Sequence, residues 1–243
     1  MNYSKGKMIY SGKSKSLYGT QDPKMCIAEF RNDITAGNGA KHEQLAHKGE
    51  LNNQINAYFM RILGEAGIAT HFVQYINPTE SLIKSLKMIS LEAVVRNVAA
   101  GSLCRRLGLK LGEPLPHTLY ELYYKSDALN DPLVSEDHAL MMSWATQEQL
   151  DQMRRSSLKI NEILSQKLSE HGLILVDAKF EFGILDNQIV LGDEISPDSC
   201  RIWDQVTGKI LDKDRFRQDL GGVIEGYQEL ARRLKISQVP GVL

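Results

Sequence analysis

The sequence has few of the residues and runs that mark several common classes of protein. Its 243 residues include only three cysteines, Cys26, Cys104 and Cys200, which are far apart and have no Cys-x-x-Cys spacing. Structural zinc and redox sites generally use that spacing. We therefore expect three small buried thiols in a reducing compartment rather than a metal or disulfide framework.

Long apolar runs are also lacking. The longest, such as residues 172–176, are far shorter than the roughly 20 apolar residues that a membrane-spanning helix needs. The first seven residues carry two lysines with no apolar stretch behind them, unlike a signal peptide. These features predict a cytoplasmic protein with no membrane partner.

Charge of one sign is not in excess. Lys plus Arg number 29 and Asp plus Glu number 30, so the formal net charge is −1. This balance leaves no positive field for non-specific nucleic-acid binding, and any bound phosphate must be held locally. The chain also exceeds the usual domain length of about 100–150 residues, which favours one large domain or two lobes.

Strand patterns dominate the first third of the chain. Apolar alternation and turn residues predict strands over residues 8–10, 17–18 and 25–30. Residues 43–63 follow a 3.6-residue apolar period and predict one helix. Residues 76–87 have the character of a hinge or an edge between lobes.

The rest of the chain mixes helices and strands without regular alternation. Thr146 and Gln149 form a capping box at the start of a long helix. The other expected elements are a strand over 91–95, a helix opening with Ser102 as its N-cap, strands over 173–182 and 188–193, and a last helix over 219–234. This order indicates an α+β fold with two lobes rather than a doubly wound sheet.

Residues 12–16, Gly-Lys-Ser-Lys-Ser, form a basic turn between two expected strands. Such a turn can fold over a polyphosphate, because its backbone N–H groups approach closely and the ammonium groups of Lys13 and Lys15 neutralise charge. The alternative is a solvated basic hairpin tip, and this segment by itself does not decide between them.

Residues 96–102 join the end of a strand to the start of a helix. The N-terminal N–H groups of a helix form an anion site, and Arg96 can add a guanidinium to the same phosphate, with Ser102 at the cap. The alternative is an ordinary capped helix beside a surface arginine.

The strongest signal lies in residues 173–183. Strand alternation puts Asp177, Lys179 and Glu181 on one face of an otherwise apolar strand. The opposite face carries Val176, Ala178, Phe180 and Phe182. Three charges on one face of a buried strand indicate a functional surface.

A hairpin centred on Asn187 would make Glu181 and Asp193 cross-strand partners, with Cβ atoms about 5 Å apart. Two carboxylates so placed repel each other unless a positive group lies between them. The functional interpretation is a Mg²⁺ ion that holds nucleotide phosphates. The alternative is partial neutralisation by Lys179.

Residues 196–198 form a turn that places Asp198 and Arg201 just beyond the expected metal. An acidic and a basic group together suit a ribose hydroxyl and a phosphate or carboxylate. An Asp–Arg surface pair is the alternative.

Taken together, these segments resemble the SAICAR synthetase (phosphoribosylaminoimidazole-succinocarboxamide synthase) family. The resemblance rests on Gly-Lys-Ser-Lys at 12–15, Phe-Arg-Asn-Asp at 30–33, Val-Val-Arg-Asn at 94–97, Ala-Ala-Gly-Ser at 99–102, Leu-Val-Asp-x-Lys-x-Glu-Phe-Gly at 175–183, Gly-Asp-Glu-Ile-Ser-Pro-Asp-Ser at 192–199 and Asp-Arg-Phe-Arg at 214–217. One departure is Ala178, where an aromatic residue is expected; residues 237–243 match nothing in the family pattern.

The resemblance implies an ATP-dependent ligase of purine biosynthesis, which joins L-aspartate to 5-amino-1-(5-phosphoribosyl)imidazole-4-carboxylate (carboxyaminoimidazole ribotide) through an acyl phosphate. It implies a two-lobed, ATP-grasp-like α+β fold with antiparallel sheets and ATP in a cleft between the lobes. The β-rich lobe would be residues 1–85 and the α+β lobe residues 86–243. A homodimer is the expected assembly.

The resemblance also assigns roles on the nucleotide side. Lys13 and Lys15 would neutralise the ATP phosphates, and Met88 would lie near the adenine. Glu181 and Asp193 would hold Mg²⁺.

On the substrate side, Lys179 would lie at the transferring phosphoryl group, and Asp177 would orient a substrate group. The substrate-binding residues would be Arg96, Ser102, Asp198 and Arg201. The residues that bind aspartate stay open, with the loop over 32–38 as one expectation.

Two other functions stay open on the residues alone. A small-molecule kinase would use the same turn and carboxylate pair, and a catalytically silent nucleotide-binding regulator would bind ATP without turnover. Release of ADP that depends on aspartate distinguishes the ligase from both.

Overall fold

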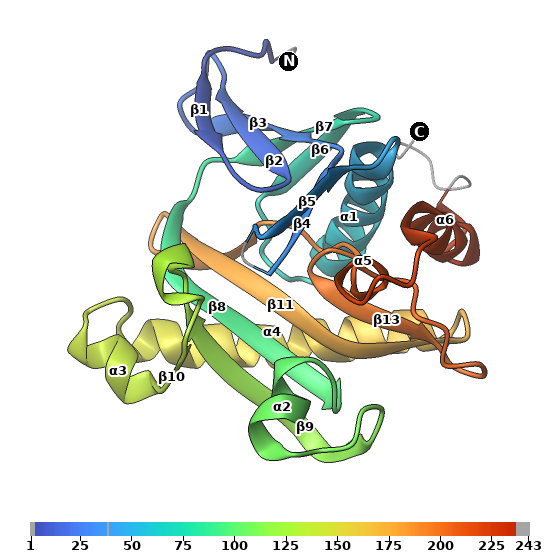
Figure 1. Ribbon diagram of the computed structural model, residues 1–243. Coiled ribbons are helices and arrows are strands. Elements are labelled where there is room, and N and C mark those ends of the chain that lie inside the picture. Colours follow the sequence, from blue (N-terminus) through green and yellow to red (C-terminus); the bar gives the residue numbers. More distant parts are fainter. Residues whose placement is uncertain (1–2, 38, 237–243) are drawn as a thin grey trace.

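The computed structural model describes residues 3–37 and 39–236. Two antiparallel sheets dominate it (Figure 1). The five-stranded sheet has the order β1 (Met8–Ser11), β2 (Lys15–Gly19), β3 (Met25–Phe30), β7 (Glu80–Lys84) and β6 (Phe72–Asn77). The six-stranded sheet has the order β10 (Leu133–Val134), β9 (Pro114–Tyr124), β8 (Lys87–Val98), β11 (Leu173–Leu185) and β12 (Gln188–Gly192), with β13 (Cys200–Asp204) also paired to β11.

The helices lie around these sheets. The remaining elements are the hairpin β4 (Asp33–Ala36) and β5 (Lys41–Gln44), the helices α1 (Lys48–Glu65), α2 (Ser102–Leu107), α3 (Glu136–Met141), α4 (Gln147–Ser169), α5 (Asp214–Arg217) and α6 (Val223–Arg233), and the 3₁₀ turn η1 (Asp127–Leu129). Helix α4 packs on one face of β8 and β11 (Figure 1). None of the helices within residues 3–37 and 39–236 combines the length and the hydrophobicity that a membrane-spanning helix requires.

The apolar core joins α1, α4 and the six-stranded sheet. Val176, Ala178, Phe180 and Phe182 of β11 are all at most 1% exposed. The expected core face of this strand is therefore confirmed, and Ala178 lies in the core, away from any chemistry. The strand alternates so strictly because α4 covers only one of its faces.

Several expected elements are confirmed. β1, β2 and β3 lie where the alternation placed them, and β1 and β2 pair as a hairpin around the basic turn. Thr146 caps α4, where its side chain and that of Gln149 make the reciprocal bonds of the capping box. The α+β fold class is also correct.

The beginning of α1 was expected too early. The helix begins at Lys48, and residues 41–44 form β5, which pairs with β4. His47, at the N-cap, has a left-handed φ of 66°, so the chain turns sharply there before the helix begins. Pairing with β4 therefore outweighed the helical period of residues 43–47.

The stretch 76–87 is mostly not a hinge. Strand β7 lies inside the five-stranded sheet between β3 and β6, and only Ser85 and Leu86 separate it from β8. The last helix, α6, begins at Val223 rather than 219, because Asp219, Gly221 and Gly222 all have positive φ. Strand β9, strand β13 and helices α3 and α5 were not expected.

Candidate active site

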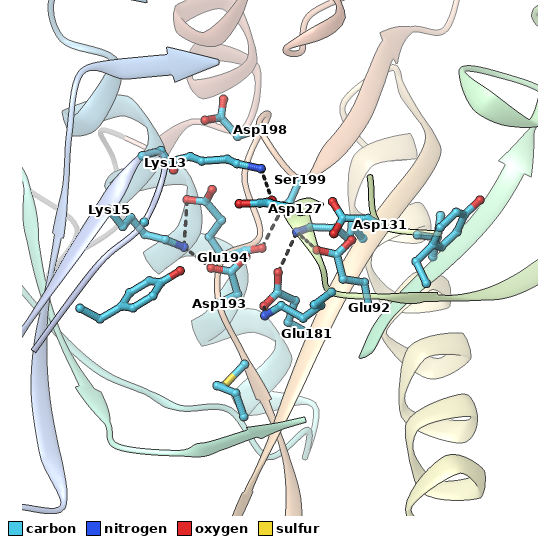
Figure 2. Close-up of a pocket in the computed structure, with 18 of the residues that line it drawn as sticks. Lys13, Lys15, Glu92, Asp127, Asp131, Glu181, Asp193, Glu194, Asp198 and Ser199 are labelled. Atoms are coloured by element: carbon cyan, nitrogen blue, oxygen red, sulfur yellow. Dashed lines mark hydrogen bonds and ion pairs between the residues drawn. The ribbon is translucent and has the colours of Figure 1, made fainter. Parts of the chain in front are cut away.

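A cavity of about 1200 Å³ lies between the two large sheets. The β1–β2 turn lines it from the five-stranded sheet, and β8 and β11 line it from the six-stranded sheet. The segment 193–201 and the start of α5 close a further side. Figure 2 shows the acidic and basic side chains that gather there.

The polar face of β11 points into this cavity. Asp177, Lys179 and Glu181 all line it, as the alternation predicted. On the neighbouring strand β8, Glu92 and Arg96 line it too, whereas Leu91, Ala93 and Val95 are fully buried on the other face. The same two-residue period in residues 91–96 would have identified Glu92, which sequence reasoning missed.

Lysines neutralise the carboxylates at one end of the cavity. The Lys179 ammonium donates to Glu181 Oε1 at 2.7 Å and to Glu92 Oε1 at 2.8 Å. Lys125, another missed residue, also pairs with Glu181. Lys15 pairs with Asp193 and lies 3.5 Å from Glu194 Oε2.

The predicted direct pairing of Glu181 with Asp193 is wrong by one residue. The β11–β12 hairpin turns on two residues, Asp186 and Asn187, so Glu181 lies opposite Gly192. The centre of the hairpin therefore lies between Asp186 and Asn187 rather than on Asn187, and the strand register differs by one residue from the prediction. Asp193 follows the strand with a φ of 54°, and its side chain still lines the cavity beside Glu181 (Figure 2).

Mutual charge keeps Lys15 and Asp193 ionised. Burial by itself raises the pKa of Asp193, but Lys15 and Lys179 lower it, and the net result is well below the usual range. Burial lowers the pKa of Lys15, yet the carboxylates of Asp193 and Glu194 raise it above its ordinary value. The Asp193 carboxylate therefore stays charged beside the ammonium groups of Lys15 and Lys179.

The described residues do not form a metal site made of protein ligands alone. They contain no group of three or more His, Cys, Asp or Glu side chains arranged to hold an ion. Mg²⁺ bound with a nucleotide commonly uses one or two carboxylates, with phosphates and water completing its shell. Glu181 and Asp193 suit that arrangement, and the alternative pairing of Glu181 with Lys179 is present in the same cavity.

Arginines form the other end of the cavity. Arg96 Nη1 and Arg201 Nη1 each lie 2.9 Å from Asp177 Oδ2, so one carboxylate holds both guanidinium groups. Arg96 Nε lies 2.7 Å from Glu121 Oε2, and Arg201 Nε lies 2.7 Å from Asp214 Oδ2. These ion pairs orient both guanidinium groups before any ligand arrives.

Ser102 lies beside this arginine pair, but it is not the N-cap. Gly101 holds that position with a φ of 57°, and Ser102 Oγ accepts a hydrogen bond from Arg96 Nη2 at 3.3 Å. A Cβ at Gly101 would lie 2.6 Å from Arg201 Nη2. Glycine is therefore required there, both for its backbone angle and for the close approach of Arg201.

Asp198 has partners that the sequence did not indicate. It lines the cavity, but it pairs with Lys48 at 2.7 Å and accepts a hydrogen bond from Tyr227 at 2.6 Å, whereas Arg201 pairs elsewhere. Lys48 is fully buried on α1, with Asn52 and Asn56 buried at four-residue intervals behind it. That polar spacing was the signal available in the sequence for a buried polar stripe.

The basic turn reaches across the cavity. Lys13 Nζ lies 2.6 Å from Asp127 Oδ1 of η1 (Figure 2). Arg31 donates to the Gly12 carbonyl at 2.6 Å and so ties the turn to the end of β3. Met88, 40% exposed, lines the cavity next to the strand link 85–86.

Such a charged cleft, open to both sheets, is typical of enzymes that act on phosphorylated substrates together with a nucleotide. A family model described as SAICAR synthetase matches residues 8–234. The chain is 59% identical over 236 residues to the phosphoribosylaminoimidazole-succinocarboxamide synthase of Coxiella burnetii, covering 97% of this chain and 98% of that one. It is 53% identical to the Acinetobacter baumannii synthase, covering 96% and 97%.

Solved structures agree with these relatives. The Ehrlichia chaffeensis synthase superposes with a TM-score of 0.93 at 44% identity, covering 96% of this chain and 100% of that one. A SAICAR synthetase in complex with ADP gives a TM-score of 0.90 at 44% identity, covering 93% and 96%. The chain therefore belongs to the SAICAR synthetase family, and it is an ATP-dependent ligase that joins L-aspartate to carboxyaminoimidazole ribotide in purine biosynthesis.

Proposed function

We propose that the two ends of the cavity divide the substrates of this ligase between them. ATP lies at the lysine end, with its phosphates under the turn 12–16 and its adenine near Met88. The observation that supports this proposal is that the turn lines the same cavity as β8 and β11. The ADP complex of a 44% identical relative supports nucleotide binding in this fold.

Glu181 and Asp193 hold Mg²⁺ in this arrangement. Mg²⁺ supplies charge neutralisation on the phosphate oxygens. Lys15 and Lys179, which pair with the two carboxylates in the structure, then have the ATP phosphates as new partners. The lysine end thus exchanges one set of neutralising contacts for another without leaving a buried charge unpaired.

Arg96, Ser102 and Arg201 bind the phosphate of the ribotide at the arginine end. Each guanidinium is already oriented by carboxylates, and a guanidinium fork suits phosphate oxygens. Asp177, which joins the two arginines, positions them. Asp198, whose carboxylate is held by Lys48 and Tyr227, orients a substrate group.

The chemistry needs positioning and charge neutralisation more than a dedicated nucleophile. A carboxylate is a poor electrophile, so its oxygen first attacks the γ-phosphorus of ATP and ADP leaves. The amine of aspartate then attacks the carbonyl carbon of the acyl phosphate, loses a proton and displaces phosphate. Lys179 lies at the transferring phosphoryl group, where its charge favours the transition state.

Three further expectations belong to this proposal. The lobes divide as residues 1–85 and 86–243, which agrees with sheet membership, since the five-stranded sheet ends at Lys84 and the six-stranded sheet begins at Lys87. The enzyme acts as a homodimer, and it acts in the cytoplasm.

Coupled measurement of ADP release tests the proposed chemistry. With carboxyaminoimidazole ribotide, ATP and Mg²⁺ present, turnover should require L-aspartate, and oxygen-18 from the ribotide carboxylate should appear in the released phosphate. Sustained ADP release without aspartate, or phosphate without the label, would contradict the acyl-phosphate route.

A further inference from the structure

The turn over residues 12–16 is held from outside the cavity by one arginine. Arg31 follows β3 directly, and its backbone N–H donates to the Ser14 carbonyl at 2.8 Å. Its guanidinium donates to the Gly12 carbonyl at 2.6 Å and to the buried hydroxyl of Ser16. One side chain therefore contacts both ends of the turn.

Arg31 can act on the cavity only through this turn. Residues 11–15 line the cavity, whereas Arg31 does not. Within the turn, the Gly12 N–H donates to the Lys15 carbonyl at 2.8 Å. A glycine loses more conformational freedom on folding than any other residue, so a contact to Gly12 from outside the turn helps to fix its shape.

A carboxylate two residues along the chain holds the arginine. Arg31 Nε lies 2.9 Å from Asp33 Oδ2, and Asp33 Oδ1 lies 2.9 Å from His42 Nε2. Burial raises the pKa of Asp33, but hydrogen bonds with His42 and Arg31 lower it to about 2, so the carboxylate is charged at neutral pH. None of the described residues between 32 and 44 lines the cavity, so the described part of the loop 32–38, one expectation for aspartate binding, lies outside it.

The hairpin that carries Asp33 is itself fixed to two helices. Ile34 is fully buried in an apolar cluster with Phe216 of α5 and Tyr227 of α6. Lys41 Nζ, on the second strand of the hairpin, donates to the Phe216 carbonyl at 2.8 Å. The hairpin β4–β5 thus gives Asp33 a packed support behind the turn.

We propose that Arg31 is a positioning residue for the nucleotide phosphates, and that the hairpin β4–β5 holds Arg31 through Asp33. The ammonium groups of Lys13 and Lys15 belong to the turn, so the position of the turn sets where they meet the phosphates. Arg31 makes no contact with the nucleotide itself. This inference rests on the proposed place of ATP under the turn.

Isothermal titration calorimetry of Arg31→Met tests the positioning role. The change keeps an unbranched side chain and removes every hydrogen bond of the guanidinium. We expect ATP and ADP to bind at least about fivefold more weakly, because the lysines of the turn lose their alignment with the phosphates, while the affinity for adenosine and the KM for the ribotide stay within about twofold. Arg31→Lys should restore part of the affinity, because it keeps the charge beside Asp33 and lacks the fork. Arg155→Met, at an exposed arginine of α4 outside the cavity, is the matched control.

Asp33→Asn tests whether the carboxylate acts through the arginine. It should weaken ATP binding about twofold in the native protein and have no further effect in Arg31→Met, because the two residues act as one unit. An equal loss in both backgrounds would overturn the part of the proposal that concerns Asp33.

Hydrogen exchange of the amides of residues 12–16 separates this inference from the proposed function. In Arg31→Met, the Gly12 N–H should exchange at least about fivefold faster, because the turn has lost its contact from outside. Unchanged exchange, or adenosine binding weakened as much as ATP binding, would overturn the positioning role. Faster exchange with unchanged ATP affinity would instead contradict the place of ATP under the turn, so the two failures are distinguishable.

Discussion

The two ends of the cavity hold their cationic side chains in different ways. At the arginine end, Arg96 and Arg201 are locked by Asp177, Glu121 and Asp214, which belong to strands or to α5. At the lysine end, flexible ammonium groups lie on carboxylates that belong to the proposed metal site. In the proposed function, the arginine end keeps its ion pairs when the ribotide binds, whereas the lysines exchange theirs for contacts with ATP.

The difference follows from the chemistry of the two cations. A guanidinium has five donors in a fixed plane, so it can keep its carboxylate and still present N–H groups to a phosphate. An ammonium is a compact charge on a flexible stem, so it could move from a carboxylate to a phosphate of a bound nucleotide. Substitutions at the two ends should therefore have different signatures.

The largest effect is expected from the carboxylate pair at the lysine end. Glu181→Gln and Asp193→Asn should each reduce Mg²⁺-dependent turnover at least about 100-fold, because each removes one of two charged ligands. The double substitution should cost little more than either one, since the two act together. ADP release over a Mg²⁺ titration measures this, with the exposed Glu162→Gln as a control; full activity in either variant would rule out a metal pair.

The lysine end should also make stability depend on pH. His71 lines the cavity and is 6% exposed, and burial together with the Lys15 charge lowers its pKa to about 4. A histidine in the unfolded chain has a pKa of about 6.5, so as the pH falls the unfolded state binds the proton before the folded state does. The contribution of neutral His71 to stability is therefore fully present above pH 6.5 and is lost as the pH falls toward 4.

This sign predicts a loss of about 2 kcal/mol in the free energy of unfolding between pH 7.5 and pH 5. His71→Gln should remove that part of the pH dependence. Urea unfolding of both proteins at the two pH values measures it, and equal slopes with pH would show that His71 does not titrate in this way.

A smaller effect is expected at the arginine end. Arg201→Lys keeps the charge and loses the fork, so the KM for the ribotide should rise about tenfold, or about 1.4 kcal/mol, while the KM for ATP barely moves. Arg105→Lys, on the exposed face of α2, is the matched control. A shift in the ATP constant instead would place Arg201 at the nucleotide.

The smallest effect should come from the basic turn, where the two lysines can be compared directly. Lys13→Ala should weaken ATP and ADP about threefold and leave adenosine unchanged, because the lost contact is charge on phosphate and this lysine is partly exposed. Lys15→Ala should weaken ATP and ADP more, because it also leaves Asp193 without its ion pair. Thermal shifts with each ligand measure this; equal weakening of all three would indicate a purely structural hairpin.

Short-range patterns in the sequence determined which faces of β11 are polar and apolar and where helix α4 begins. The alternation of residues 173–183 placed three charges of β11 in the cavity and four apolar side chains in the core, because a strand covered on one face has a period of two. The capping box at Thr146 predicted the start of α4 for a similarly local reason, since both of its bonds lie within one turn.

Only the tertiary structure decided which charges meet. The pairing of Lys48 with Asp198, of Lys125 with Glu181 and of Arg201 with Asp177 joins residues that are far apart in the chain. No local period predicts such contacts, because they depend on how the sheets and α1 pack. Register was decided in the same way: a two-residue turn moved Asp193 one place from Glu181, and pairing with β4 made a strand of residues 41–44.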